Sequence, residues 1–299
     1  VPEQAGVSNT TVTMNAASMN NSGFEFSATY RNRDHDFKYE VSANLSTLRN
    51  RVTSLGFGTD SYISGSYITK VGQEIGQFYG WVYEGIARTQ EDLDNHATQE
   101  GAQIGDCLYK DVNNDGKVDS EDQVVLGSGM PKINFGLNAR FEYKRFDLSI
   151  ATFGALNYHV SDDIYNSLNS CYGWGNKEVG MLEANRFSED GSTYLSNVPR
   201  TYVTNSASLG WNDLFSSRKI QNAAYWKIAN VELGYNFPNE WFGKYVSDVR
   251  FYVSAQNLHT FTGYHGYNVD YAGGTFTPGY NFCSYPTART FMCGVHFTF

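Results

Sequence analysis

The sequence has little charge and no excess of basic residues, and both shortages exclude classes of protein. Charged side chains make up 18% of the 299 residues, and acidic residues outnumber basic ones by 31 to 22, which gives a net charge of -9. A nucleic-acid-binding surface needs clustered Lys and Arg to neutralise phosphates, so the composition argues against a nucleic-acid partner. Aromatic residues make up 16% of the chain, which excludes a disordered protein.

Segments that target or anchor a chain are also missing. No apolar run approaches the roughly 18 residues of a transmembrane helix. The first residues, Val1 to Gln4, include neither an initiator Met nor the basic and apolar regions of a signal peptide. This start predicts an internal fragment or a mature end.

Motifs of the common enzyme classes are absent as well. The sequence has no G-x-S-x-G elbow, no H-E-x-x-H pair and no Walker A loop, and its 6 His residues are isolated. The cysteines form neither a CxxC pair nor a metal-finger spacing; they are Cys107, Cys171, Cys283 and Cys293. We therefore predict that the chain is not an enzyme, while a disulfide between two of the loop cysteines stays open.

What the sequence does contain is a regular alternation of apolar and polar residues, which predicts β-strands. The alternating segments cover residues 24–31, 37–46, 134–143, 146–150, 230–237, 249–256 and 291–299. Strands of roughly ten residues can cross a bilayer at the tilt of a barrel, whereas strands of soluble proteins typically have about five or six. The polar positions mix Gly, Asn, Ser, Glu and Arg, as is typical of a wet lumen.

The connections between these strands differ in length in a regular way. Short turns near 32–35, 144–145 and 238–247 alternate with long segments near 49–131, 158–224 and 259–289. All long segments then fall on one rim, as in outer-membrane barrels, which have long extracellular loops and short periplasmic turns. Because bacterial barrels have an even number of strands, about seven strands indicate part of a larger barrel. We predict an all-β fold in which residues 1–299 form the C-terminal segment of a transmembrane antiparallel β-barrel.

One local motif has the spacing of a calcium-binding loop. Residues 111–122 match D-x-N-x-D-G followed by five residues and an acidic twelfth position. The expected ligands are the side chains of Asp111, Asn113, Asp115, Asp119 and Asp122 and the backbone carbonyl of Lys117. The flanking residues look extended, so we predict a structural Ca²⁺ rather than a sensor. An Asn/Asp/Gly turn without metal is the alternative.

Aromatic residues crowd in two of the long segments, at residues 78–83 and around Tyr172 and Trp174. Rings in long loops can stack on sugars or pack on partner proteins. They can also form the small core of the loop itself, and we favour this second interpretation.

Several stretches resemble SusC/RagA-type TonB-dependent transporters, in the order in which that family has them. Residues 15–26 resemble the family's N-x-G-x-M-x-N-x-G-x-E stretch, with Ala17 in place of the usual Gly. Further similar stretches are residues 75–86, 110–122, 127–135 and, for the penultimate-strand signature, 253–258 followed by 261–264. The chain has Asn268-Val269-Asp270 where D-P-E is common.

The resemblance implies a 22-stranded barrel in the outer membrane of a Gram-negative, Bacteroidetes-like cell, with this chain as its last third. It implies three protein partners: the rest of the transporter chain with its plug and N-terminal strands, TonB through that missing N-terminal part, and a SusD-like surface lipoprotein. It also implies TonB-dependent import of a glycan (oligosaccharide) or peptide substrate.

Two other classes stay open on the residues alone. The first is a secreted calcium-binding β-sandwich module for carbohydrate binding or adhesion, which would be water-soluble without detergent. The second is a barrel-embedded hydrolase, which would need a nucleophile and a base that converge in the lumen. The identity of the substrate is not predicted, because the plug and most lumen-lining loops would lie outside this segment.

Overall fold

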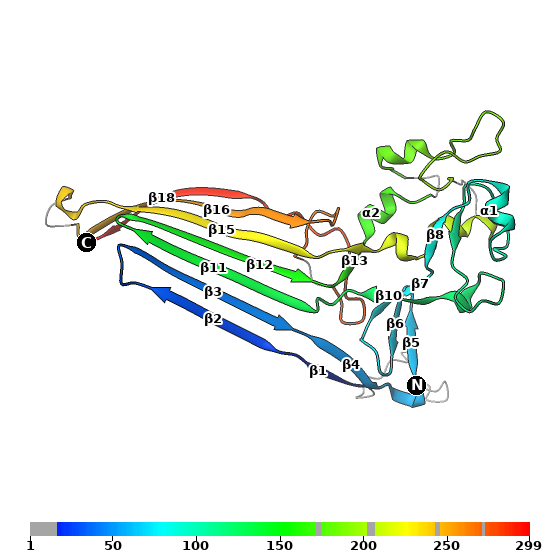
Figure 1. Ribbon diagram of the computed structural model, residues 1–299, viewed down its shortest axis with the longest axis horizontal. Coiled ribbons are helices and arrows are strands. Elements are labelled where there is room, and N and C mark those ends of the chain that lie inside the picture. The colour runs from blue at the N-terminus through cyan, green and yellow to red at the C-terminus, as the bar shows by residue number, and fades with distance from the viewer. Residues whose placement is uncertain (1–16, 172–174, 202–206, 243–245, 271–272) are drawn as a thin grey trace, which may run out of the picture.

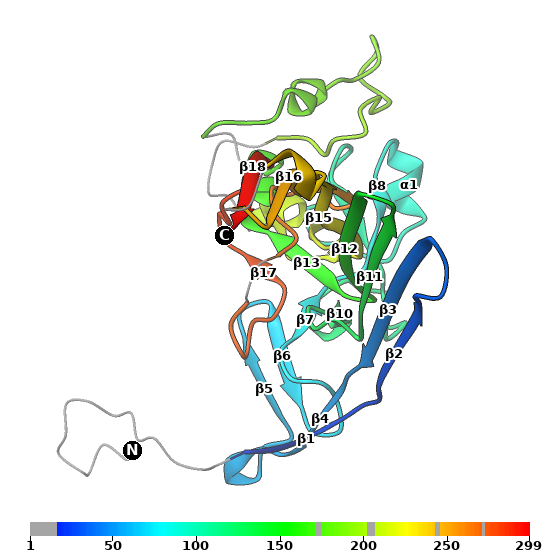
Figure 2. The same cartoon turned by 90° about the vertical axis from the view of Figure 1, so that its left-hand side faces the viewer.

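Seven antiparallel strands form one large sheet, as the alternation predicts (Figure 1). A computed structural model describes residues 17–171, 175–201, 207–242, 246–270 and 273–299. The strand order is β18-β16-β15-β12-β11-β3-β2. The strands are β2 (Glu25–Asn32), β3 (Phe37–Thr47), β11 (Ile133–Tyr143), β12 (Phe146–Leu156), β15 (Tyr225–Asn236), β16 (Asp248–Thr262) and β18 (Thr290–Thr298). Viewed from its end, the sheet curves from β18 to β2 (Figure 2).

Large apolar side chains line one face of this sheet, which we call the outer face. The strand register places them in rows, in which Phe141 lies opposite Leu148 and Leu148 lies opposite Leu233. Leu233 is 45% exposed. Other exposed apolar side chains on this face are Phe26, Tyr30, Phe37, Leu45, Leu137, Tyr143, Phe146, Phe251, Val253, Phe291, Val295 and Phe297. No second sheet packs on this face within the described residues, which excludes a sandwich there, and an apolar face of this size is typical of a surface that lipid covers.

The outer face also has the height of a membrane. The 11 residues of β3 rise about 3.3 Å each, so at a tilt of about 40° they span about 25 Å along the membrane normal. Aromatic residues mark both ends of this band. Near the turns, the ring centroids of Phe146 and Tyr235 are 4.8 Å apart, and near the loops Trp226 stacks on Phe261 at 5.4 Å. Such aromatic girdles are typical of barrel strands at the two membrane interfaces.

The opposite, inner face is polar, and ion pairs connect its strands near the turns. Arg250 of β16 donates from Nε and Nη2 to the two carboxylate oxygens of Asp147 on β12, at 3.0 and 2.5 Å. The same Nη2 donates to Glu232 on β15 at 2.8 Å. Gly234 lies beneath this cluster, where a Cβ atom would overlap both the Asp147 carboxylate and the Arg250 guanidinium. A polar inner face of this kind agrees with the predicted lumen.

A β-bulge near the loops explains why the predicted strands are too short there. The pairing of β15 with both of its neighbours shifts between Ile228 and Asn230, and Asn257 on β16 has a φ of 52°. An extra residue exchanges the faces of all residues that follow it, so the alternation does not continue past the bulge. The alternation predicted strands over residues 230–237 and 249–256. In the structure, β15 already begins at Tyr225, and β16 continues to Thr262.

The long connections gather at one end of the sheet and contain small sheets of their own (Figure 1). Their strands are β1 (Ser18–Ser22), β4 (Arg49–Ser54), β5 (Ser61–Ser64), β6 (Tyr67–Lys70), β7 (Gln77–Gly80), β8 (Tyr83–Ile86), β9 (Cys107–Tyr109), β10 (Val124–Ser128), β13 (His159–Asp162), β14 (Gln221–Asn222) and β17 (Tyr280–Asn281). The pairings are β1-β4, β10-β7-β6-β5, β8-β9 and β14-β13-β17. These short strands lack the alternation of the main sheet, and the sequence did not predict them.

Helices in the structure are short. The α-helices are α1 (Gln90–Asp94) and α2 (Asp163–Leu168), and the 3₁₀ helices are η2 (Gly56–Gly58), η3 (Ser120–Asp122), η4 (Val179–Glu183), η5 (Ala207–Asp213), η6 (Ser217–Lys219) and η7 (Asn239–Trp241). Of the helices in the described part of the chain, none has the length and apolar character needed to span a membrane. All four cysteines are free thiols, and Cys107 and Cys171 are buried in the loops.

Candidate functional site

The predicted calcium loop connects β9 to β10 and is folded by its own Asp and Asn side chains. Asp111 accepts the amide of Asn114 on Oδ1 at 2.7 Å and the amide of Gly116 on Oδ2 at 2.8 Å. Asn113 and Asp115 each accept the amide two residues further along the chain, both at 2.9 Å. Gly116 has a φ of 86°, in the left-handed region that favours glycine. The motif therefore forms a compact turn that brings its oxygens to one short segment.

Asp122, at the twelfth position, is fully buried and closes this loop. One of its carboxylate oxygens accepts the amides of Val112 and Asn113 at 2.8 and 3.4 Å, and the other accepts the amide of Asp119 at 2.8 Å. Burial opposes ionisation of this carboxyl group, but the backbone amides outweigh burial, so the pKa of Asp122 lies below its usual range. The loop therefore encloses a negative charge.

The donors of this loop are the kind that Ca²⁺ binds. Each predicted side-chain ligand accepts at least one backbone amide, and a carboxylate or amide oxygen keeps a second lone pair that can face a cation. The structure places all predicted positions in this one loop: Asp111, Asn113, Asp115, Lys117, Asp119 and Asp122. Within the described ranges, no three or more His, Cys, Asp or Glu side chains are grouped as metal ligands. Calcium binding therefore stays a prediction from donor chemistry and spacing.

Trp81 lies against the loop, where its fluorescence can test the predicted calcium binding. Its indole N–H donates to the backbone carbonyl of Asp119 at 2.9 Å. We expect Ca²⁺ at about 100 times its dissociation constant to stabilise the loop by about 2.7 kcal/mol and to change Trp81 fluorescence. Asp111→Ala should abolish both effects, while Lys117→Ala, which keeps the backbone carbonyl, should retain them. Stability and fluorescence that do not respond to Ca²⁺ would favour the metal-free turn.

The aromatic stretch at residues 78–83 packs inside the loops. Phe78 is fully buried, and its ring centroid lies 5.1 Å from that of Tyr67 and 6.0 Å from that of Phe215. For this stretch, the interpretation as the loop's own core is confirmed. The other predicted aromatic residues, Tyr172 and Trp174, lie outside the described residues.

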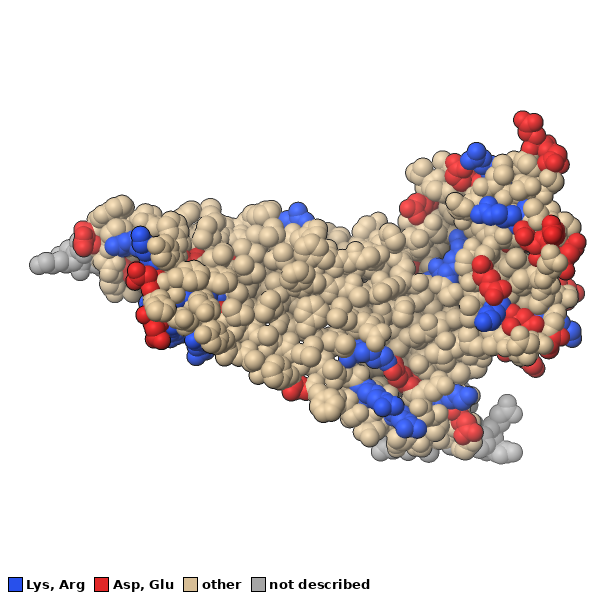
Figure 3. Space-filling view, in the orientation of Figure 1, with Lys and Arg blue, Asp and Glu red and all other residues tan. Residues whose placement is uncertain are grey.

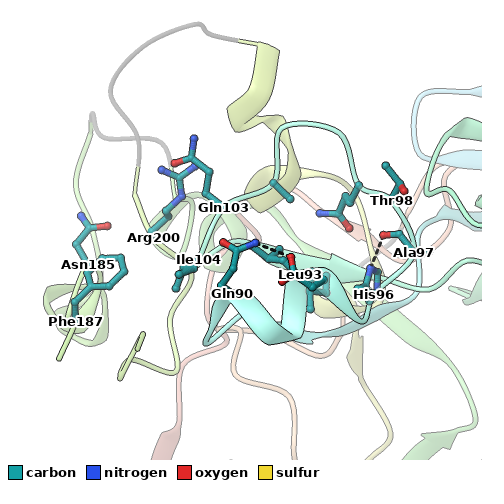
Figure 4. A pocket seen from close by; sticks show the side chains of 14 residues that line it. Gln90, Leu93, His96, Ala97, Thr98, Gln103, Ile104, Asn185, Phe187 and Arg200 are labelled. Carbon is teal, nitrogen blue, oxygen red and sulfur yellow. Dashed lines mark hydrogen bonds between the residues drawn. The ribbon is translucent and has the colours of Figure 1, made fainter. Parts of the chain in front are cut away.

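A cavity of about 750 Å³ opens beside α1 (Figure 4). Most of its polar lining consists of uncharged side chains, which can hydrogen-bond to hydroxyl or amide groups of a ligand. Its lining includes Gln90, His96, Thr98, Gln99, Gln103, Asn185, Phe187 and Arg200. Figure 4 shows that these side chains come from α1, from the segment that follows it, and from a separate segment near residues 185–200. Such a site had no signal in the sequence, because its walls are distant along the chain.

A buried ion pair joins these walls. Arg200 donates from Nε and Nη2 to the two carboxylate oxygens of Asp106, at 2.5 and 3.0 Å. Asn212 donates to the same carboxylate at 2.7 Å, and its side-chain oxygen accepts the amide of Cys107 at 2.7 Å. Asp106 is 0% exposed, so these bonds replace the water that its charge would otherwise bind. The network connects three loop segments, and its Arg200 lines the cavity.

Comparison with models of known protein families finds no match. Curated relatives, by contrast, match almost all of the chain. The TonB-dependent receptor P3 of Formosa agariphila is 29% identical, over 100% of this chain and 30% of that protein. The TonB-dependent receptor SusC of Bacteroides thetaiotaomicron is 26% identical, over 97% of this chain and 27% of that protein.

Solved structures agree with these relatives in fold. The RagAB peptide transporter superposes with a TM-score of 0.76 at 21% identity, over 95% of this chain and 29% of that chain. The chain is similar in sequence to TonB-dependent receptors that include SusC, and similar in fold to the RagAB peptide transporter. A second structure, the RagAB peptide importer in its closed-closed state, superposes with a TM-score of 0.72 at 23% identity. The chain spans less than a third of the length of the curated relatives it matches.

The location of the chain bears on the two faces of the sheet. The chain lies in the outer membrane, and an exposed apolar face of this kind suits contact with lipid there. The predicted calcium loop and the cavity lie together at the loop end of the sheet.

Proposed function

We propose that this chain forms part of the barrel wall and of the extracellular loops of a TonB-dependent importer for oligosaccharides or peptides. The observation that carries the proposal is the match of TonB-dependent receptors to 100% of the chain, on a sheet whose outer face is apolar and whose inner face is polar. Such a wall separates lipid from a wet lumen, as import through a barrel requires.

The edges of the main sheet support a partnership with the rest of a transporter chain. Within the described residues, β2 and β18 each pair with a neighbour on one side only. Unpaired strand edges are not tolerated in lipid, because their backbone groups find no water there. The proposed partners of these edges are further barrel strands of the same protein. Its plug would fill the lumen, and TonB would supply energy through the N-terminal part.

The cavity beside α1 supports a polar cargo. Its amide side chains and the ring of Phe187 suit sugars and peptides alike, since both present hydroxyl or amide groups next to apolar patches. The lining of this cavity does not distinguish sugars from peptides, so the proposal includes both as cargo.

A surface on the loops supports a SusD-like lipoprotein as partner. Val179 and Leu182 of η4 are 79% and 83% exposed, although both are apolar. They lie on a segment that projects from the loops, shown at the upper right of Figure 1. Neighbouring exposed apolar side chains on a projecting segment are typical of a contact with another protein.

Uptake by cells that carry the full-length receptor tests the proposal. We expect accumulation of defined oligosaccharides or of defined peptides, and its loss when TonB is removed. A Val179→Asp/Leu182→Asp variant should lose the co-purifying lipoprotein and much of the uptake, because charge disfavours an apolar contact. The matched variant Glu189→Ala changes an exposed polar residue of the same loop and should keep both. Uptake that persists without TonB would contradict the proposal.

A further inference from the structure

The outer face of the sheet changes from apolar to cationic at the loop end of β3 and β4. Arg49 pairs with Ser22, and Arg51 pairs with Asn20, in the β1-β4 ladder. This ladder continues the β2-β3 ladder without an inserted residue, because Leu45 pairs with Phe26 in the same register. Side chains two residues apart on a strand share a face, so Arg49 and Arg51 lie on the lipid-facing side with Leu45.

The neighbours of the two arginines on β4 confirm this orientation. Asn50 and Val52 are 5% and 2% exposed and point to the opposite side. There, Asn50 accepts the amide of Ile75 at 3.0 Å, under a loop that covers this side of the strand. Since Asn50 and Val52 are buried on that side, Arg49 and Arg51 lie on the other side of β4, where both are exposed, and the Arg51 guanidinium extends along the strand edge toward Gly72.

Their height above the apolar band matches the headgroup region of a membrane. The band along β3 ends at Thr47, and Arg49 and Arg51 follow two and four residues later. At about 3.3 Å per residue and a tilt of about 40°, they lie about 5 and 10 Å beyond the band along the membrane normal. The headgroup regions add a comparable thickness to each side of the hydrocarbon core.

No side chain among the described residues neutralises the charge at this position. Within residues 17–299 as far as they are described, neither Arg49 nor Arg51 forms an ion pair or a side-chain hydrogen bond. Lys132 lies close by, paired with Glu74, and its pKa is lowered first by burial and then by the positive charge of Arg49. Figure 3 shows Lys and Arg side chains gathered around β4, next to the uncharged surface of the sheet. Like charges this close favour a bound anion.

We infer that Arg49 and Arg51 form a binding site for the phosphate groups of lipids in the outer leaflet. A guanidinium binds phosphate through two parallel N–H groups, and it lies here on the face that lipids themselves contact. A soluble ligand in the lumen would reach only the other face. The site therefore takes an anionic glycolipid or phospholipid whose acyl chains pack on the apolar rows around Leu45 and Phe26.

Native mass spectrometry of the full-length receptor in detergent tests this site. The probe is lipid A, a glycolipid that carries phosphates, compared with the same glycolipid after its phosphates are removed. We expect the receptor to retain the phosphorylated form more strongly. Arg49→Gln/Arg51→Gln should reduce this retention by about 30-fold, since each cation near a membrane surface contributes about fivefold. Arg49→Lys/Arg51→Lys should keep most of it.

The control removes the same charge elsewhere. Lys110→Gln/Arg186→Gln changes two exposed side chains of the long loops and should retain lipid A as the unchanged receptor does. Unchanged retention in the Arg49→Gln/Arg51→Gln receptor would overturn the inference, since other carboxylates of the protein would then cover the arginines. Equal retention of both forms of the glycolipid would overturn it too. Heat-resistant migration in gels verifies that each variant is folded.

Discussion

Leu233→Arg is expected to destabilise the barrel by about 2–4 kcal/mol, because it places a charge in the hydrocarbon region of the membrane. Leu233 is 45% exposed on the outer face, in one row with Leu148 and Val253. This row lies two residues in from the turn-side rings of Phe146 and Tyr235, so we expect a cost at the lower end of that range. Unfolding of the full-length receptor in lipid bilayers, followed by denaturant titration, measures the free energy.

The matched variant Asn138→Arg adds the same side chain to the inner face. Asn138 lies in the middle of β11, opposite Ala151, and is exposed to the lumen. We expect a change within about 0.5 kcal/mol there, because the added charge stays in water. Equal costs for the two variants would mean that both faces are equally wet, and the assignment of the outer face to lipid would be wrong.

Arg200→Ala is expected to cost about 3–5 kcal/mol in the stability of the loops, since it leaves the buried carboxylate of Asp106 without its cation. The two residues form two hydrogen bonds, and the Asp106 side chain is 1% exposed. When the ion pair is lost, the backbone hydrogen bonds from Ala87 to Asp106 and from residue 200 to Gly105 should open more often. Hydrogen exchange at the amides of Ala87 and Arg200 measures this loss directly.

An exposed ion pair in the same loop provides the comparison. Arg186 and Glu183 are 2.9 Å apart, with side chains that are 61% and 59% exposed. Because water screens such a pair, Arg186→Ala should cost less than about 1 kcal/mol. If the amide of Ala87 exchanges hydrogen at the same rate in the Arg200→Ala and Arg186→Ala variants, the Asp106 network does not hold the loops together.

The main sheet could be predicted from the sequence because its pattern is local and repeated. Each strand alternates apolar and polar residues, since lipid and water lie on its two sides, and the seven strands of the structure match the predicted segments. The bulge at Ile228 to Asn230 marks the limit of this signal. One extra residue exchanges the two faces, and no residue type between Tyr225 and Asn230 announces that change.

The loop end was predictable only where a motif is contiguous. Residues 111–122 fold through bonds between near neighbours, so spacing alone predicted a compact turn. The cavity beside α1 depends on Asp106 and Arg200, which are 94 positions apart, and on Asn212, which is 106 positions from Asp106. Pairs at such distances leave no periodic trace in a single sequence, so the candidate cavity emerged only from the structure.

The central claim, that the apolar face of this sheet contacts lipid, is tested most directly by nitroxide labels placed one at a time along β15. The labels occupy positions 230 to 233 and 235 of the full-length receptor in lipid nanodiscs, in a background without the exposed Cys283 and Cys293; Gly234 is left unchanged because a side chain there would overlap Asp147 and Arg250. We expect high collision rates with oxygen, which dissolves in lipid, at Val231, Leu233 and Tyr235. High rates with a water-soluble nickel chelate are expected at the alternate positions. Collision rates that do not alternate between the two reagents along β15 would contradict the claim.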